Sequence, residues 1–304
     1  MPELPDVAIY IERLSALFSG QVLEQARLKS PFLVRSFDPP LSAVHGKRVA
    51  GFRRIGKRVV FAFEEELFLV FHLMIAGRFH LKDKGDPLAG KAALLGLDFA
   101  TQTLVLTEAG SKRRASLHVV RGEQGLEQFA RGGLEVLGSS YDEFQRALVL
   151  ENRTLKRALT DPRLFSGIGN AYSDEILHAA RLSPVKLTQS LSEAEIVRLH
   201  AATESVLNTW IVRLRLEVGS GFPEKVTAFR PEMAVHGRFQ KPCPVCGTPV
   251  QRISYAANEL NYCPTCQTGG KLLADRGLSR LLKADWPKSL EELEEYKAVR
   301  RTPR

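Results

Sequence analysis

The sequence predicts an α+β protein with an N-terminal antiparallel β-sandwich domain, a helical domain and a C-terminal β-hairpin zinc finger. Three observations support this fold class: short β-branched and aromatic segments up to about residue 137, helical periodicity from Tyr141 onward, and two Cys-x-x-Cys pairs near the C-terminus. A chain of 304 residues is too long for one typical domain. The three predicted domains and the extension after them cover residues 1–137, 138–235, 236–270 and 271–304.

The composition is that of an ordinary folded protein, with 44% hydrophobic and 25% charged residues. No apolar run reaches the roughly 20 residues that cross a bilayer, and the first residues, MPELPDVAIY, do not resemble a secretory leader. We therefore expect a cytoplasmic protein. Its formal charge of +9 favours an anionic partner, because Lys and Arg bound along a phosphate backbone release condensed counterions. Solvated basic faces are the alternative interpretation of this charge.

The first domain is expected to begin with an amphipathic helix over residues 7–18 and to continue mainly as strands. The clearest strands lie at residues 58–63, 67–71 and 103–106, where β-branched and aromatic residues are separated from one another by Gly, Pro and charged clusters. Short strands with such separators are typical of an antiparallel sandwich or barrel.

The second domain is expected to be helical. Ser192 and Glu195 occupy the reciprocal positions of a capping box at the start of a long helix. Residues 161–170 are expected to form a turn flanked by two helices, in a helix–turn–helix arrangement. The apolar face of the long helix is expected to consist of Ile196, Leu199, Thr203, Val206, Leu207, Trp210, Ile211 and Leu214.

All four cysteines lie in the two Cys-x-x-Cys pairs, Cys243 with Cys246 and Cys263 with Cys266. Residues 247–262 separate the pairs, which is a spacing typical of a four-thiolate zinc site. Four protein ligands leave no open coordination position, so we expect one structural zinc ion. The intervening residues suit a small β-hairpin that depends on the metal for its stability. Such a finger can enter a DNA groove, but many zinc ribbons bind only protein.

Pro2 is a candidate nucleophile, because removal of Met1 exposes its secondary amine. An α-amino group titrates near pH 8, so much of it is unprotonated at neutral pH, unlike a lysine. Such an amine can attack a sugar C1′ and form an iminium intermediate, and the adjacent carboxylate of Glu3 can move the protons. Taken by itself, however, a proline at position two is common.

Several motifs, in order along the chain, resemble those of the formamidopyrimidine-DNA glycosylase family (the Fpg/MutM and endonuclease VIII group). Together they cover roughly residues 1–267. The matching segments are MPELPD at the N-terminus, Gly56-Lys57-Arg58, His72-Leu73 with Gly77-Arg78, the helix–two-turn–helix signature at residues 167–175, and Gly237-Arg238 followed by the cysteine pairs up to Gln267.

The resemblance implies a DNA repair glycosylase and lyase that acts on double-stranded DNA with damaged bases or abasic sites, as a monomer in the cytoplasm at the nucleoid. It implies that Pro2 is the Schiff-base nucleophile and Glu3 the acid and base. The remaining roles are carried over as follows: Lys57 in proton donation and phosphate contact, Asn170 and Lys156 in phosphate contact, His72 near the DNA, and Cys243, Cys246, Cys263 and Cys266 on zinc. A solvated Lys57 and a core His72 are the alternatives.

Three departures from the family pattern bear on the reaction. The family fills the gap left by the flipped nucleotide with a Met and with an Arg-Phe pair, whereas this chain has Ile75 at the position of the Met and no Arg-Phe in residues 108–114. The candidates to fill the gap are Ile75, Met74 or a basic residue of that loop. Asn258, a candidate DNA contact, stands where the family has an Arg that assists δ-elimination. The extension after Gln267 is longer than usual, and a surface-packed helix is the expectation for it.

The resemblance therefore implies excision of oxidised purines, such as 8-oxoguanine and formamidopyrimidine, followed by β-elimination. Leu4 favours this branch, because the endonuclease VIII branch usually has Gly there. Two alternatives stay open: excision of oxidised pyrimidines, and a catalytically weak protein that binds lesions.

Overall fold

The computed structural model describes all residues except 111, 256–257, 275–286, 294 and 296–304. The chain divides into two compact units, which are considered separately. Unit 1 comprises residues 1–133 and 207–227, and unit 2 comprises residues 134–206 and 228–304. Among the described residues no helix is long and apolar enough to cross a membrane.

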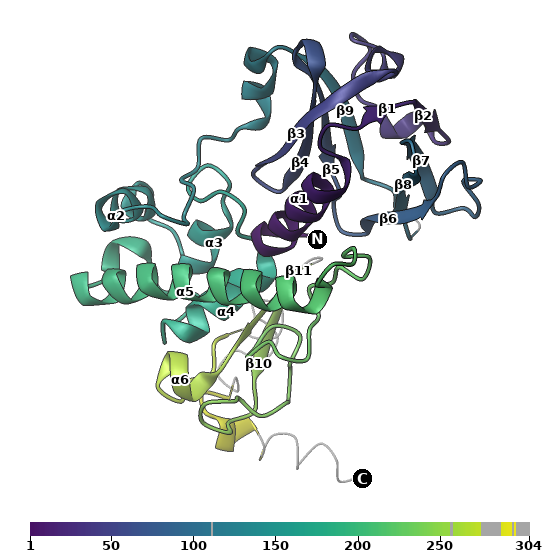
Figure 1. The fold of residues 1–304 in the computed structure, drawn as a ribbon. Helices are drawn as coiled ribbons and strands as arrows, with labels where there is room; N and C mark the ends of the chain where they lie inside the picture. The colour runs from purple at the N-terminus through teal and green to yellow at the C-terminus, as the bar shows by residue number, and fades with distance from the viewer. Residues whose placement is uncertain (111, 256–257, 275–286, 294, 296–304) are drawn as a thin grey trace, which may run out of the picture. The chain divides into compact units, whose positions relative to one another are not determined.

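Unit 1 is built on two antiparallel sheets with a helix beside them (Figure 1). One sheet has the strand order β1-β3-β4-β5-β9 and the other the order β2-β7-β8-β6. The helix and strands are α1 (Leu4–Phe18), β1 (Val22–Leu23), β2 (Gln25–Leu28), β3 (Lys47–Ile55), β4 (Arg58–Phe63), β5 (Leu67–His72), β6 (Gly77–Asp83), β7 (Ala93–Asp98), β8 (Gln102–Glu108) and β9 (Ser116–Arg121). The predicted sandwich and its three clearest strands are confirmed.

Strands β4 and β5 are buried on both faces, which explains their nearly continuous apolar sequence. Val59 and Phe61 point into the main core between the sheets, together with Val7 and Tyr10 of α1. Val60 belongs to a second cluster on the opposite face, which the 3-10 turn Glu123–Phe129 covers. The turn between β3 and β4 is therefore attached to a strand that is packed on both faces.

Helix α1 begins at Leu4, three residues before the expected position of Val7. The earlier start has a local cause. Pro5 in the first turn already has the φ angle of a helix. The carboxylate of Asp6 accepts a hydrogen bond from the main-chain N–H of Glu3 at 3.0 Å and so satisfies one of the free donors at the helix start. The helix consequently begins directly after Pro2 and Glu3.

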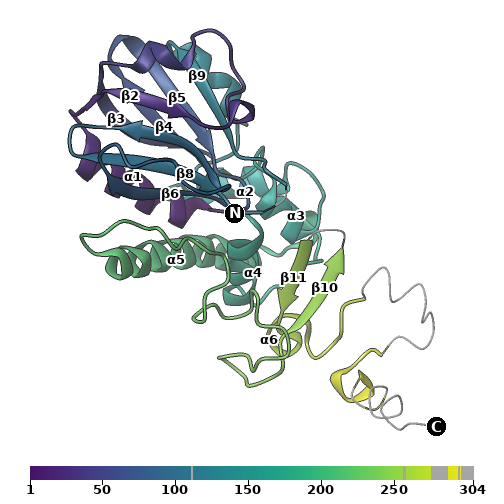
Figure 2. The same cartoon turned by 90° about the vertical axis from the view of Figure 1, so that its right-hand side faces the viewer.

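Unit 2 contains helices and a two-stranded hairpin (Figure 2). Its elements are α2 (Tyr141–Val149), α3 (Leu155–Thr160), α4 (Asn170–Ala179), β10 (Gln251–Tyr255), β11 (Asn258–Tyr262) and α6 (Pro264–Thr268), and the long helix α5 (Glu193–Val218) belongs to it up to residue 206. The predicted capping box is present, since Ser192 N donates to Glu195 Oε2 at 2.8 Å and Glu195 N donates to Ser192 Oγ at 3.3 Å. The predicted zinc-finger hairpin is confirmed as β10 and β11.

The extension after the finger starts as a segment packed on that hairpin. Leu273 packs against Ile253, Leu260 and Tyr262, and its N–H donates to the hydroxyl oxygen of Tyr262 at 2.8 Å. Leu272 N also donates to Lys288 O at 2.9 Å. Most of the helix expected in this extension falls outside the described residues.

Candidate active site and zinc centre

Pro2 and Glu3 are both buried and lie immediately before the first turn of α1. The N-terminal end of a helix carries a partial positive charge, which favours an anion such as the Glu3 carboxylate. This position also disfavours a protonated amine. The local sequence therefore places the candidate nucleophile and the candidate acid and base at one end of one helix.

The charges around the chain terminus come from separate elements of unit 1. Burial is the largest effect on the Met1 amino group and lowers its pKa below the usual value. Among the charged groups, Glu3 raises this pKa, while Arg78 and Lys57 lower it further. The charges of Lys57 and Glu3 thus both act on the N-terminal amine. Arg78 is a further charge that acts on it.

Lys57 lies in the tight turn that connects β3 to β4, where Ile55 pairs with Arg58. Gly56 has a φ of 59°, a left-handed conformation that a glycine adopts at little cost. His72 ends β5 opposite Arg58. Burial, followed by the charges of Arg58 and Lys57, lowers the pKa of His72 to about 4, so the imidazole is neutral at pH 7.

The turn after His72 presents a hydrophobic side chain to solvent. Gly77 N donates to Leu73 O at 2.8 Å and closes the turn, and a Cβ on Gly77 would lie 2.3 Å from that same oxygen. Met74 adopts a φ of 52°, although it is not a glycine. Ile75 follows at the tip of the turn with 65% of its surface exposed. This is the position at which the sequence comparison placed the gap-filling Met.

Arg78, in the Gly77-Arg78 motif, is a residue of this site whose role was not predicted from the sequence. Its guanidinium donates to Val226 O through Nε at 2.5 Å, and to Ile75 O through Nη1 at 3.1 Å. Arg78 therefore links the Ile75 turn to the segment 219–227. Arg13 holds the same segment through Gly221 O, with Nε at 2.7 Å, and Val226 is buried in the core of unit 1.

The loop that lacks the Arg-Phe pair is closed by Glu108. This buried carboxylate accepts hydrogen bonds from Arg114 N at 2.9 Å and from Ala115 N at 3.0 Å. The basic residues Lys112, Arg113 and Arg114 are exposed. The described part of the loop thus offers positive charge and presents no aromatic side chain.

In unit 2, Asn170 is the first residue of α4, and its side-chain amide donates to Glu259 O of β11 at 2.9 Å. Lys156 is buried on the neighbouring helix α3. Its Nζ donates to Asn170 O at 2.6 Å, to Ser173 Oγ at 2.8 Å and to Asp174 Oδ1 at 2.5 Å. An ammonium group has three hydrogens, so these three acceptors account for all of them.

Two consecutive acidic residues of α4 hold the start of the finger. Glu175 accepts from the main-chain N–H groups of Ala234, Val235 and His236 at 2.7 to 2.9 Å. Burial raises the pKa of Glu175, and these three hydrogen bonds oppose that shift. Asp174 Oδ2 lies 2.8 Å from His236 Nδ1. These contacts were missed in the sequence, where Asp174 and Glu175 counted only as part of the family signature.

The four cysteines meet at the base of the hairpin. Their Sγ atoms all lie within 4.8 Å of one another, and three separations, Cys246–Cys263, Cys246–Cys266 and Cys243–Cys266, are 3.4, 3.5 and 3.9 Å. Sulfurs at about 2.3 Å from a tetrahedral zinc are about 3.8 Å apart, whereas a disulfide requires about 2.05 Å. The donor set and its geometry therefore fit one zinc ion. The side chain of Asn258, in β11, lies outside the described residues.

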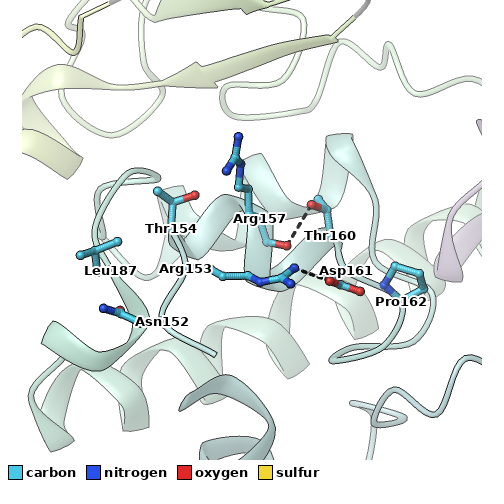
Figure 3. Close-up of a pocket in the computed structure, with 8 residues that line it drawn as sticks. All are labelled: Asn152, Arg153, Thr154, Arg157, Thr160, Asp161, Pro162 and Leu187. Atoms are coloured by element: carbon cyan, nitrogen blue, oxygen red, sulfur yellow. Dashed lines mark hydrogen bonds and ion pairs between the residues drawn. The ribbon is translucent and has the colours of Figure 1, made fainter. Parts of the chain in front are cut away.

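A hollow of about 710 Å³ lies on unit 2, beside α3, and its lining does not include the candidate site residues. Figure 3 shows Arg153 reaching toward Asp161, while the guanidinium of Arg157 points away from that pair. Arg153 Nη1 lies 2.5 Å from Asp161 Oδ2, so this pair neutralises itself. The lining residues are Asn152, Arg153, Thr154, Arg157, Thr160, Asp161, Pro162 and Leu187.

Three family models match the chain in the same order as the motifs. Residues 1–115 match the formamidopyrimidine-DNA glycosylase N-terminal domain, residues 137–216 match the formamidopyrimidine-DNA glycosylase H2TH domain, and residues 240–269 match the zinc finger found in FPG and IleRS. The last match, together with the clustered cysteines, identifies a site for one structural zinc ion.

Curated proteins match over most of the chain. The formamidopyrimidine-DNA glycosylase of Thermus thermophilus is 35% identical over 281 residues, which are 89% of this chain and 100% of that protein. The one from Listeria monocytogenes is 29% identical and covers 88% of this chain and 100% of its own length. An uncharacterized formamidopyrimidine-DNA glycosylase-like protein of Mycobacterium tuberculosis is 45% identical over 151 residues, 50% of this chain and 94% of that protein.

Solved structures of Lactococcus lactis Fpg share the fold. Its complex with DNA that contains an abasic site has a TM-score of 0.76 at 26% identity and covers 88% of this chain and 99% of that one. Its wild-type complex with DNA that contains an oxidized pyrimidine has a TM-score of 0.76 at 27% identity, with 88% and 100% covered. The order of domains, the near-complete alignment with a relative at 35% identity and the cysteine cluster agree, and the chain belongs to the formamidopyrimidine-DNA glycosylase family.

Proposed function

We propose that this protein is a bifunctional DNA glycosylase and abasic-site lyase that excises oxidised purines through a Schiff base on Pro2. The observation that carries the proposal is the environment of the N-terminal amine. Burial lowers the pKa of the Met1 amino group, and the charges of Glu3, Arg78, Asp6 and Lys57 also act on it. Pro2 is buried one residue further along, so its amine is expected to be largely unprotonated at neutral pH.

The proposed chemistry follows from these groups. The Pro2 nitrogen attacks C1′ of the damaged nucleotide, the bond from C1′ to the base breaks, and the base leaves with that electron pair and takes up a proton. The C1′–O4′ bond of the sugar ring then breaks, O4′ takes up a proton, and the Pro2 nitrogen, which has lost its own hydrogen, forms an iminium with C1′. This iminium makes the hydrogen on C2′ acidic. A base removes that proton, the C3′–O bond breaks by β-elimination, and water later hydrolyses the imine. Glu3 is the residue proposed to carry protons in these steps.

DNA is the proposed partner. Its damaged nucleotide has to leave the stack, which costs a few kcal/mol and least at a damaged base. Lys57, the neutral His72 and Asn170 are proposed to contact the backbone. Lys156 is proposed to position the Asn170 turn, because its three hydrogens are already engaged by Asn170, Ser173 and Asp174. The domain limits 1–137, 138–235 and 236–270 belong to the same proposal.

Ile75 is proposed to fill the gap left in the duplex. It is exposed at the tip of a closed turn, and Arg78 anchors that turn through Ile75 O. An aliphatic wedge separates stacked bases without reading their identity. The discrimination between lesions is then assigned to the pocket that receives the flipped base.

Borohydride trapping tests the proposal. Duplex DNA with 8-oxoguanine or with an abasic site is incubated with the protein and borohydride, and a covalent adduct is expected. The matched control is the same chain with an uncleaved N-terminal extension before Pro2, which keeps every side chain and removes only the free amine. Failure of the wild-type chain to form an adduct with abasic-site DNA would overturn the enzymatic proposal.

A second substrate class is favoured by one specific finding. Lactococcus lactis Fpg, a structural neighbour, has been solved with DNA that contains an oxidized pyrimidine, and a mutant of it with Fapy-dG DNA. Rates of base release from 8-oxoguanine, formamidopyrimidine and oxidised-pyrimidine duplexes decide between the classes. Faster release of the pyrimidine would replace the purine assignment.

A further inference from the structure

Helix α4 contacts a zinc ligand through a histidine that belongs to no part of the finger. His178 Nε2 lies 3.2 Å from Cys243 Sγ. His178 is 6% exposed and Cys243 is 2% exposed, so water does not compete for this contact. From this geometry we propose that His178 is an outer-sphere partner of the zinc site, donates a hydrogen bond to the Cys243 thiolate, and thereby fixes α4 on the finger.

The direction of the hydrogen bond follows from the chemistry of the ligand. A cysteine that binds zinc is a thiolate and has no hydrogen to donate. The ring nitrogen of His178 is therefore the donor, which assigns the tautomer with a hydrogen on Nε2. A donor at this place withdraws negative charge from sulfur and stabilises the ligand in its bound form.

Two main-chain donors to these sulfurs are local. Val245 N lies 3.5 Å from Cys243 Sγ, and Cys266 N lies 3.5 Å from Cys263 Sγ. Both belong to the Cys-x-x-Cys turns themselves and form together with them. His178 is different, because it precedes Cys243 by 65 positions and belongs to another element. Its contact therefore ties the metal site to the helix, whereas the main-chain donors stabilise only the finger.

The contact is one of three on the same face of α4. Residues four positions apart lie above one another on a helix, and Asn170, Asp174 and His178 have this spacing. Asn170 Nδ2 donates to Glu259 O at 2.9 Å, and Asp174 Oδ2 accepts from Asn261 N at 3.2 Å. All three side chains contact the finger, so the geometry of the metal site helps to set the rotation and register of the helix that begins at Asn170.

Zinc release from the intact protein tests the first part of the proposal. The expected result is that His178→Phe, which keeps a planar ring but has no N–H, releases zinc to a chromophoric chelator about tenfold faster than wild type, within the range typical of lost outer-sphere partners. The matched control is His200→Phe in α5. His200 is a half-buried histidine of the same unit whose ring bonds to Ser139 O at 3.1 Å and packs against Tyr141 and Phe144, and its loss should leave the release rate unchanged.

A second measurement uses the wild-type chain and needs no variant to fold. With an NMR-active cadmium isotope in place of zinc, scalar coupling is expected between the metal and the hydrogen on His178 Nε2, across the N–H···S bond. A third measurement compares the two variants: hydrogen exchange over residues 170–178 is expected to rise in His178→Phe and not in His200→Phe, and equal exchange in both contradicts the proposal. A ring that carries its hydrogen on Nδ1, without coupling to the metal, overturns the proposal, and so does zinc release from His178→Phe at the wild-type rate.

Discussion

Lys156 and Asp174 form an ion pair in the interior of unit 2, with Nζ 2.5 Å from Oδ1 and side chains that are 4% and 0% exposed. Lys156→Met leaves the Asp174 carboxylate without its cation, which is expected to destabilise the protein by about 3–5 kcal/mol. Chemical denaturation measures this loss. The control, Lys186→Met, breaks the more exposed pair with Glu195 and should cost no more than about 1 kcal/mol. Equal losses of stability in the two variants would argue that Lys156 is not a structural cation. If Lys156→Met instead lowers the DNA affinity at unchanged stability, Lys156 is a phosphate contact.

Ile75→Ala is expected to slow base excision from a paired lesion by about tenfold, while cleavage of a preformed abasic site changes little. The reason is that the shorter side chain buries less apolar surface in the duplex gap, at a cost of roughly 1–2 kcal/mol, which corresponds to about tenfold in rate. Single-turnover kinetics on the two substrates measure the difference. Leu28→Ala, at another exposed aliphatic residue of unit 1, serves as the control. An equal loss on both substrates contradicts a role in filling the gap.

His72 is expected to make the stability of the protein depend on pH in the acidic range. Its pKa is about 4 in the folded chain, compared with 6.5 ordinarily, chiefly because of burial. The unfolded chain therefore binds the proton more readily, so the contribution of His72 is complete above pH 6.5 and is lost as the pH falls toward 4, by up to about 3 kcal/mol. Denaturation at several pH values should show a smaller acid-induced loss in His72→Gln than in wild type. Parallel curves for the two chains would refute this.

Arg78→Met is expected to shift the pH profile of borohydride trapping to higher pH. The positive charge of Arg78 lowers the pKa of the N-terminal amino group, so its removal lets the amine keep its proton to a higher pH. Arg13→Met is the matched control, because Arg13 also holds segment 219–227 but is not among the charges that act on the amine. An equal shift of the pH profile in both variants would show that the effect comes from loosening segment 219–227 and not from the charge of Arg78.

Asn258→Arg is expected to raise the proportion of δ-elimination product relative to β-elimination product. An amide can bond to a phosphate but supplies no positive charge, whereas a guanidinium binds it through two charge-assisted hydrogen bonds. Product ratios on a denaturing gel measure this. Asn152→Arg places the same charge on an exposed part of unit 2 and should leave the ratio unchanged. Predominant δ-elimination by the wild-type protein contradicts the expectation.

The sequence was sufficient for the elements whose causes are local. The capping box at Ser192 and Glu195, the strands at 58–63 and 67–71 and the hairpin between the cysteine pairs all follow from residues close together in the chain. Even the missed start of α1 has a local cause, since Asp6 caps the helix at Glu3. Such features can be inferred before any tertiary contact is known.

The remaining features depend on contacts between distant residues. Arg78 acts through the main-chain oxygen of Val226. Every residue type has such an oxygen, so the identity of residue 226 does not indicate the contact. Lys156 resembles an ordinary surface cation until the fold places it beside Asp174. His178 gave no signal at all, because a single histidine on a helix is compatible with many surroundings. Its role became visible only when α4 and the finger were placed together.

The double burial of β4 and β5 has a consequence for local opening of unit 1. Backbone amides exchange with solvent at rates that report the free energy of local unfolding, and this energy is highest in strands covered on both faces. Short edge strands such as β1 and β2 open at lower cost. Lys57 lies in the turn directly before β4, and His72 ends β5, so the fraying that loosens the sheet edges leaves these two residues in place.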